Sequence, residues 1–350
     1  MARSMRLFLI RHGETVDNVA GLYAGIRDSE LTNHGYQQAT RLGQHFKAIG
    51  LSFTHLYSSH LQRAAKTAGK IREGQLASSS SDPLPASIPD VVQLPLLVEQ
   101  DFGSMEGKKF YERPPESKLT GKEHHRLESK GSPGFVDVES KDSMANRADT
   151  FLDEHLLPLL ADHSGVAERC IAIVSHGIFL STLWKRLLLR LPGKSVVLSP
   201  ELQATARPSL EHLGGWSNTG YLELLMTRPV VPVIAMAADA PSPSITAPFP
   251  LPAEMPAAGH QVLLEDTVPV SGTVSKTPEE QPAEVSRQDP EIELPVLISR
   301  VAHGWETTIL AINSKDHLKG LKRTGGGVGS SRHDASQKSI DTFFKRRKVA

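Results

Sequence analysis

Two histidines in this chain of 350 residues each follow a short apolar segment. Residues 7–10 lead directly into Arg11 and His12, and residues 170–174 lead through one serine into His176. A cation and an imidazole at the carboxyl end of a buried strand lie where open α/β sheets bind ligands. A single pair of this kind is more simply a strand followed by a polar turn. A strand, a histidine and a glycine that occur twice in one chain favour a ligand site.

The first histidine block has a recognisable pattern. Residues 11–15 read Arg-His-Gly-Glu-Thr, and Asn18 follows shortly after them. This block resembles the signature of the histidine phosphatase superfamily, also called the phosphoglycerate mutase-like family. The resemblance implies that His12 is a nucleophile that accepts a phosphoryl group on nitrogen, with Arg11 and Asn18 binding the substrate.

Three further blocks extend the resemblance. Residues 57–68 match the family's second block and imply that Arg63 is a second arginine that binds phosphate. Residues 97–107 match the pattern Leu-x-Glu-x-x-x-Gly-x-x-Glu-Gly, which gives Glu99 the implied role of proton donor. His176 matches the family's second histidine. The family often has arginine before this glutamate, whereas this chain has Val98, which we interpret as a change in substrate contacts.

The residues that the resemblance implies have complementary chemistry. A transferring phosphoryl group carries charge on its oxygens, and Arg11 and Arg63 can each form forked hydrogen bonds with two of them. Asn18 and His176 would add donors. His12 must attack with an unprotonated nitrogen, so we expect a backbone carbonyl to hold its other nitrogen. Glu99 would give a proton to the leaving oxygen and then activate water. No metal or other cofactor is expected, because the arginines supply the positive charge.

The elements that position these residues follow from hydrophobic patterns. The resemblance implies an α/β fold with three layers, α/β/α, around a mostly parallel central sheet. Apolar runs predict strands at residues 7–10, 53–57, 91–98, 170–174 and 221–226. Helical spacing and the family match predict helices at about 36–49, 61–71, 141–160 and 178–191, and a serine pair at 58–59 is placed to cap the second of these. Residues 108–138 correspond to the family's cap over the site.

The composition changes after residue 226. Twelve of the 24 prolines lie between Arg228 and Pro290, so we expect residues 227–290 to be a disordered insertion. Residues 307–312 again resemble a strand. We therefore expect residues 291–320 to return to the phosphatase domain that residues 1–226 mainly form. The alternative is that residues 307–312 belong to the tail.

Overall composition limits the class of protein. Basic and acidic residues balance at 39 each, so the whole chain implies no general attraction to nucleic acid. The single cysteine, Cys170, excludes an internal disulfide and fits a reducing compartment. No segment reaches 18 consecutive apolar residues, and the first strand follows the N-terminus too closely for a signal peptide. We expect a protein of the nucleus and cytoplasm with no membrane partner.

The tail, residues 321–350, carries a separate signal. From Lys315 onward the chain has ten basic and three acidic residues. Four positions are similar to the motif that docks in the sliding clamp PCNA, namely Gln337, Ile340, Phe343 and Phe344 of the segment 337–344. One helical turn would place the three apolar side chains on one face, ready for an apolar groove. The alternative is an apolar cluster that folds back onto the domain. The basic run at 345–348 suits nuclear import or weak contact with DNA phosphates.

Together these features predict a phosphomonoesterase that is tethered to PCNA by its tail. The substrate would be a phosphorylated small molecule or a phosphopeptide, and sugar phosphates and nucleotides fit equally well. A phosphoglycerate-type mutase would use the same histidine, but the chain shows no insertion pattern specific to mutases. A clamp-binding adaptor with an idle phosphatase domain is disfavoured because every implied catalytic position is filled.

Overall fold

The computed structural model describes residues 3–76, 88–109, 123, 126–127, 130–162, 168–204, 209–229, 301–322 and 328–334. All of these residues belong to one compact unit. The clamp-like motif at 337–344 and most of the expected insertion and cap lie outside the described residues. The disordered insertion at 227–290 therefore stays a prediction.

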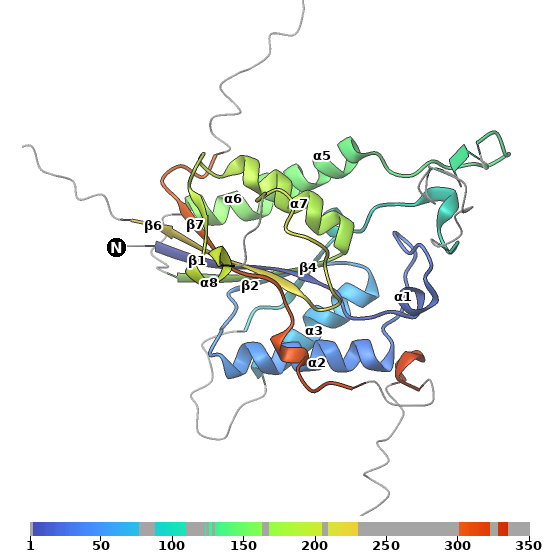
Figure 1. Ribbon diagram of the computed structural model, residues 1–350, viewed down its shortest axis with the longest axis horizontal. Helices are drawn as coiled ribbons and strands as arrows, with labels where there is room; N and C mark the ends of the chain where they lie inside the picture. Colours follow the sequence, from blue (N-terminus) through green and yellow to red (C-terminus); the bar gives the residue numbers. More distant parts are fainter. Residues whose placement is uncertain are drawn as a thin grey trace, which may run out of the picture. The chain divides into compact units, whose positions relative to one another are not determined.

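A mixed sheet of seven strands forms the centre of the fold (Figure 1). Its order is β3-β2-β4-β1-β6-β7-β5. Strand β6 is antiparallel to both neighbours, and all other neighbouring pairs are parallel. The strands are β1 (Arg3–Arg11), β2 (His55–Ser59), β3 (Val91–Leu94), β4 (Glu168–Ser175), β5 (Val196–Leu198), β6 (Tyr221–Arg228) and β7 (Glu306–Ser314).

Helices cover both faces of the sheet, so the predicted α/β/α architecture is confirmed. Figure 1 shows α2 and α3 on one face and α5, α6 and α7 on the other. The short helices α1 and α8 follow β1 and β5 along the chain. The helices are α1 (Val16–Ala20), α2 (Asn33–Ala48), α3 (Gln62–Leu76), α5 (Lys141–Phe151), α6 (Leu157–Ala161), α7 (Gly177–Arg190) and α8 (Pro200–Gln203).

Strand β1 divides the core into two layers. Its side chains alternate between the faces of the sheet, as the strand period of two requires. Phe8 and Ile10 pack into the cluster that includes Phe46 of α2, whereas Leu7 and Leu9 pack into the cluster that includes α5 and α7. Because both faces are covered, β1 is apolar on both sides, and this explains why it reads as a continuous apolar run.

Strand β4 is buried along almost its whole length and lies between β1 and β2, parallel to both. The expected central parallel strand is therefore confirmed. Its cysteine, Cys170, is buried, and desolvation raises the pKa of the thiol to about 12. A thiol in this state is inert at neutral pH, which fits a structural role.

Prolines account for two differences from the predicted elements. The strand expected at 91–98 ends at Leu94, because Pro95 has no N–H for the sheet and begins a single 3₁₀ turn, Pro95–Leu97. The helix expected at 141–160 contains a π-helical turn, Leu152–Leu156, before Pro158 of α6. Ser140 caps the start of this helix by accepting a hydrogen bond from the backbone of Ser143.

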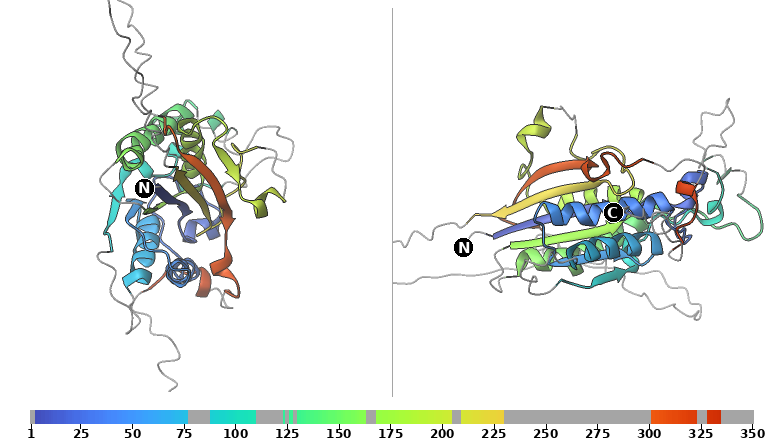
Figure 2. Two further views of the ribbon diagram at one scale, coloured as in Figure 1. Left: turned by 90° about the vertical axis from the view of Figure 1, so that its left-hand side faces the viewer. Right: turned by 90° about the horizontal axis from the view of Figure 1, so that it is seen from below.

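Residues 306–314 return to the sheet as β7, which lies beside β6 (Figure 2). The pairing is antiparallel and joins Thr227 to Glu306, so the chain leaves and re-enters the sheet at adjacent positions. The register shifts near Tyr221, where Asn313 adopts a positive φ of 47°. A bulge of this kind turns a side chain away from the regular alternation.

No helix within the described ranges has the length and apolarity needed to cross a membrane.

Close backbone contact between α2 and α3 predicts an unequal response to two alanine substitutions. A Cβ atom at Gly43 of α2 would lie 2.2 Å from the carbonyl oxygen of Lys70 in α3, whereas nothing lies within 4 Å of a Cβ atom at Gly69. Gly43→Ala should lower the free energy of unfolding by about 1–3 kcal/mol. Gly69→Ala should raise it by roughly 0.5–1 kcal/mol, because alanine favours the helix. Urea unfolding of both variants tests this, and equal stabilities would contradict the packing.

Candidate active site

The candidate residues meet at one edge of the sheet. Strands β3, β2, β4 and β1 are neighbours and parallel, so their carboxyl ends lie side by side. The segments that leave these four ends carry Glu99, Arg63, His176 and the pair Arg11 and His12, respectively. The carboxyl edge of such a sheet is the usual ligand site of open α/β folds. The rings of His12 and His176 lie 5.0 Å apart between their centroids.

His12 is held with one nitrogen available for attack. Its Nδ1 lies 2.7 Å from the carbonyl oxygen of Gly13. Because a carbonyl can only accept a hydrogen bond, Nδ1 carries the hydrogen, and Nε2 keeps its lone pair. This is the backbone contact expected from the sequence. The imidazole is buried, and it presents the nitrogen form that a nucleophile requires.

His176 is held in the opposite tautomer. Arg63 donates a hydrogen bond from Nε to Nδ1 of His176 at 3.1 Å. Since a guanidinium has no lone pair to offer, Nδ1 is the acceptor and Nε2 of His176 carries the hydrogen. Within the described part of the chain, this buried Nε2 has no hydrogen-bond partner. His176 therefore offers one N–H donor to a ligand.

Arg63 is almost fully buried, at 1% exposure, and backbone carbonyls hold its guanidinium. Nη1 donates to the carbonyl of Arg27 at 2.7 Å, and Nη2 donates to those of Ala24 and Gly25 at 3.2 and 2.7 Å. Desolvation lowers the pKa of Arg63 to about 10, opposed mainly by the charge of Glu99. The guanidinium therefore stays charged at neutral pH and is fixed in position.

Glu106 organises the loop that holds Arg63. Its carboxylate accepts hydrogen bonds from the backbone N–H groups of Gly25, Ile26 and Arg27, and from that of Phe102. These bonds orient the same loop whose carbonyls face Arg63. The sequence matched Glu106 to the family pattern but gave no role for it; the structure shows that it positions an arginine of the site.

Arg11 contacts the loop before β6. Nη1 donates to the carbonyl of Trp216 at 2.6 Å, while Nε is buried and has no hydrogen-bond partner among the residues that the structure describes. Desolvation lowers the pKa of Arg11, and the charge of Glu99 opposes this effect. Arg11 thus keeps one buried N–H that no described residue accepts, as His176 does.

The carboxylate of Glu99 contacts the N-terminus of α7, the helix that begins directly after His176. Its Oε1 accepts backbone hydrogen bonds from Phe179 and Gln100 at 2.9 and 3.0 Å, and its Oε2 accepts one from Ile178 at 3.1 Å. The partial positive charge of a helix N-terminus favours a carboxylate at this position. Oε2 has fewer donors than Oε1 and is the oxygen better placed to exchange a proton.

Arg147 fixes the segment that carries Glu99. Its guanidinium donates to the carbonyls of Leu96 and Val98, at 2.8 and 3.1 Å, and forms a forked pair with the carboxylate of Glu139, with both distances 2.8 Å. Glu139 in turn donates its backbone N–H to the carbonyl of Asp101. The start of the long helix is thereby joined to the segment that leaves β3.

Asn18 has a structural contact in addition to its expected role. In α1, Asn18 and the N-cap Thr15 form a reciprocal capping box, in which Oδ1 of Asn18 accepts from the backbone of Thr15. The same Oδ1 accepts from Nδ2 of Asn218, which also donates to the carbonyl of His12. Asn218 is a residue that the sequence did not single out. Its only signal was the Asn-Thr-Gly segment before β6.

Burial governs the charge of the two histidines. Desolvation lowers the pKa of His12 well below its usual value, and the charges of Arg63 and Arg11 lower it further. The same causes, desolvation first and then Arg63, lower the pKa of His176. Both imidazoles are therefore neutral near pH 7, so the lone pair of His12 does not depend on deprotonation by another group.

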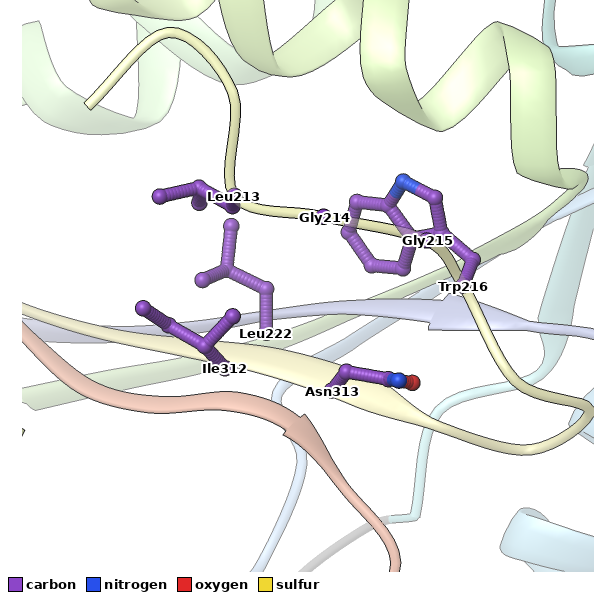
Figure 3. Close-up of a pocket in the computed structure, with 7 residues that line it drawn as sticks. All are labelled: Leu213, Gly214, Gly215, Trp216, Leu222, Ile312 and Asn313. Carbon is purple, nitrogen blue, oxygen red and sulfur yellow. The ribbon is translucent and has the colours of Figure 1, made fainter. Parts of the chain in front are cut away.

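No cluster of His, Cys, Asp and Glu suited to holding a metal ion occurs within the described residues. A separate small pocket lies between the loop at 213–216 and strands β6 and β7 (Figure 3). Trp216 lines this pocket and also holds Arg11 through its carbonyl.

This fold and site are those of a phosphatase-type enzyme. The model of the histidine phosphatase superfamily (branch 1) matches residues 7–197, and the chain belongs to this superfamily.

Curated relatives agree with this assignment. The chain is 35% identical over 189 residues to a probable phosphatase of Schizosaccharomyces pombe. The aligned region covers 52% of this chain and 56% of the relative. It is 28% identical over 173 residues to a broad-specificity phosphatase of Saccharomyces cerevisiae, which covers 49% of this chain and 66% of the relative. The chain spans about half the length of the first curated relatives it matches.

Solved structures to which the chain is similar include a phosphoglycerate mutase from Bacillus anthracis. The TM-score is 0.42 and the sequence identity is 19%, with 64% of this chain and 88% of the other covered.

The two neutral, buried histidines predict a loss of stability in acid. Their folded-state pKa values lie below the unfolded value of about 6.5, so the unfolded chain binds more protons as the pH falls below that value. For each such histidine, the free energy of unfolding falls by at most about 1.4 kcal/mol for every unit by which the pH drops below that value. His12→Asn keeps an N–H near Gly13 but does not titrate, so its unfolding free energy should fall less between pH 7 and pH 5 than that of the wild type.

Urea unfolding at several pH values measures this difference. His212, an exposed histidine, provides the control, because His212→Asn should leave the pH dependence unchanged. A wild-type protein that is equally stable at pH 7 and pH 5 would contradict the buried neutral state.

Proposed function

We propose that this protein is a phosphomonoesterase that works through a phosphohistidine intermediate on His12. The observation that carries the proposal is the pair of opposite tautomers. His12 offers a lone pair on Nε2, and His176 offers a hydrogen on Nε2, with ring centroids 5.0 Å apart. A nucleophile beside a fixed donor is the arrangement that attack on an anionic phosphate requires.

The proposed reaction has two balanced steps. In the first step, Nε2 of His12 forms a bond to phosphorus as the bond to the ester oxygen breaks, and Glu99 gives a proton to the leaving oxygen. In the second step, water attacks the phosphohistidine, Glu99 takes a proton from that water, and inorganic phosphate leaves. Arg11 and His176 donate to the phosphoryl oxygens through nitrogens that no described residue occupies. The nearby charge of Arg63 stabilises the same oxygens.

Glu99 needs one rearrangement to act as the acid. Both of its oxygens accept backbone hydrogen bonds in this structure, and a proton on Oε2 would replace only the bond from Ile178. Oε1 would keep its two donors and hold the carboxyl group in place. Asn18 supports the site from the side of α1, and the substrate class remains a phosphorylated small molecule or a phosphopeptide.

Substitution of the nucleophile tests this proposal. His12→Ala should reduce the turnover of p-nitrophenyl phosphate by at least about 10⁴-fold, because no other described residue offers the attacking lone pair at this position. Arg63→Lys should reduce it by roughly 10²-fold, since lysine cannot reproduce the three carbonyl contacts and the bond to His176. His212→Ala serves as the exposed control and should keep wild-type turnover.

Rapid quenching with labelled ester should also show a label on wild-type protein that survives alkali and is lost in acid. Interconversion of phosphoglycerate isomers without release of phosphate would instead favour a mutase. Wild-type protein that turns over no phosphate ester in a broad metabolite panel would favour an idle domain that acts as an adaptor.

We further propose that the tail tethers this domain to the sliding clamp PCNA. The supporting observation is that the chain contacts the domain as far as His333, four residues before Gln337. His333 stacks on Tyr36 of α2 with ring centroids 3.6 Å apart and donates its backbone N–H to the carbonyl of Leu31. A motif that begins so close to an anchored segment would bring the catalytic domain next to the clamp.

Removing the aromatic pair tests the tether. The double substitution Phe343→Ala and Phe344→Ala should weaken binding to purified PCNA by about 10²-fold or more, because two buried aromatic anchors are lost. Turnover of p-nitrophenyl phosphate should not change. Lys338→Ala, inside the motif but at a variable position, is the matched control for calorimetric titration. Unchanged clamp affinity would overturn the tether, and a loss of turnover would favour an apolar cluster that folds back onto the domain.

A further inference from the structure

His317 lies outside the strands that carry the catalytic residues, yet it contacts the loop beneath them. It belongs to the 3₁₀ turn Asp316–Leu318, which follows β7, and its side chain is buried. Its Nε2 lies 2.9 Å from Oγ1 of Thr219. The proposed mechanism gives His317 no role, and a buried imidazole paired with a buried threonine calls for an explanation.

Thr219 has an unfavourable backbone conformation. Its φ is 55°, in the left-handed region that β-branched residues rarely adopt. Such a conformation persists only where the surroundings hold it firmly, and it is frequent at functional sites. Thr219 is fully buried, and its backbone N–H donates to the carbonyls of both Arg11 and His12, at 3.0 and 3.2 Å. The backbone of Thr219 thus fixes the position of the backbone at Arg11 and His12.

The hydrogen-bond directions around Thr219 are determined. Its hydroxyl donates its only hydrogen to the carbonyl of Asn218 at 2.7 Å, so it must accept a hydrogen from Nε2 of His317. Nδ1 of His317 is then the unprotonated nitrogen, and it is buried without a hydrogen-bond partner among the described residues. Asn218, fixed at its carbonyl by this hydroxyl, donates from its side chain to the carbonyl of His12.

The surroundings keep His317 neutral, so only one of its two nitrogens carries a hydrogen. Desolvation lowers the pKa of His317 to about 4, and His45 and Arg41 of α2 lower it further while Asp316 opposes them. The ring of Tyr221 stacks on His317 with centroids 6.1 Å apart.

A second residue of the same segment holds the other half of the loop. Asn313, at the bulge in β7, accepts from the backbone of Ser217 at 2.9 Å and donates to its hydroxyl at 3.1 Å. Figure 3 shows Asn313 on the side of the pocket that faces the loop of Trp216, whose carbonyl accepts from Arg11. Asn313 of β7 and His317 of the turn after it therefore hold the loop at residues 216–219, which contacts both Arg11 and His12.

We propose that His317 is a positioning residue, whose hydrogen bond to Thr219 holds the backbone that places His12 for attack. This inference rests on the proposed function for its kinetic consequence, but not for its structural one. Misplacement of a nucleophile by a fraction of an ångström affects the chemical step more than substrate binding. Loss of the hydrogen bond should therefore lower kcat and leave KM nearly unchanged.

Two substitutions of similar volume separate the hydrogen bond from packing. His317→Leu removes the donor, and it should lower kcat about 10- to 100-fold for p-nitrophenyl phosphate, with KM changed less than about threefold. His317→Gln places an amide N–H near the position of Nε2, and it should recover most of the loss. Both are measured at temperatures where near-ultraviolet circular dichroism shows a fully folded protein.

A glycine at the strained position provides the decisive test. Thr219→Gly adopts a positive φ without support, so His317 should no longer matter in that background. There His317→Leu should change kcat by less than about twofold. An equal loss in both backgrounds, or a His317→Leu protein with wild-type kcat, overturns the proposal.

Nuclear magnetic resonance of the imidazole nitrogens keeps this test independent of turnover. In the wild type, the shifts of His12 should show a protonated Nδ1 and an unprotonated Nε2. In His317→Leu the ring nitrogen and proton shifts of His12 should move because the backbone of His12 is displaced, although Gly13 still selects the tautomer, and in His317→Gln they should stay at the wild-type values. If wild-type protein released no phosphate from any ester, the proposed function would fail, while these shifts would still decide the role of His317.

Discussion

The site depends on the fixation of two imidazoles in opposite tautomers. A neutral imidazole in water exchanges between two forms, and the proposed phosphoryl transfer requires one particular form of each histidine. The carbonyl of Gly13 selects the form of His12, and the guanidinium of Arg63 selects that of His176. The first contact is local in the chain, whereas the second joins the start of α3 to the residue that follows β4. The tautomer of His12, the proposed nucleophile, is therefore set by its own turn, whereas that of His176 is set only when the sheet has assembled.

Burial makes this arrangement demanding. Charged groups removed from water are costly unless they are paired, and Arg63 meets this cost with three backbone carbonyls and His176. Those carbonyls point inward because Glu106 gathers the N–H groups of the same loop. Arg11 and His176 each keep a buried N–H that donates to no described residue. The donors thus already converge before an anion arrives, which is the form of preorganisation that electrostatic catalysis uses.

Much of the fold and of the candidate site could be predicted from the sequence, and particular residues show the physical reasons. Strand β1 is buried on both faces, so its apolar run was unmistakable, and the polar residues that follow it and β4 mark the ligand edge of a parallel sheet. The short helix α1 was not predicted, because five residues give too little periodicity. Asn218, Thr219 and His317 were missed as site residues, since their hydrogen bonds join groups that lie about 100 to 200 positions apart in the sequence.

The pairing of β6 with β7 has a consequence for how this chain can vary. Thr227 and Glu306 are partners across the two strands, so the intervening chain begins and ends at nearly the same point in space. The entropic cost of closing a flexible loop grows only with the logarithm of its length, by about 0.6 kcal/mol for each doubling. Segments of very different size and composition are therefore tolerable at this position during evolution, whereas Asn313 and His317, which follow the return to the sheet, are held by hydrogen bonds to the loop before β6.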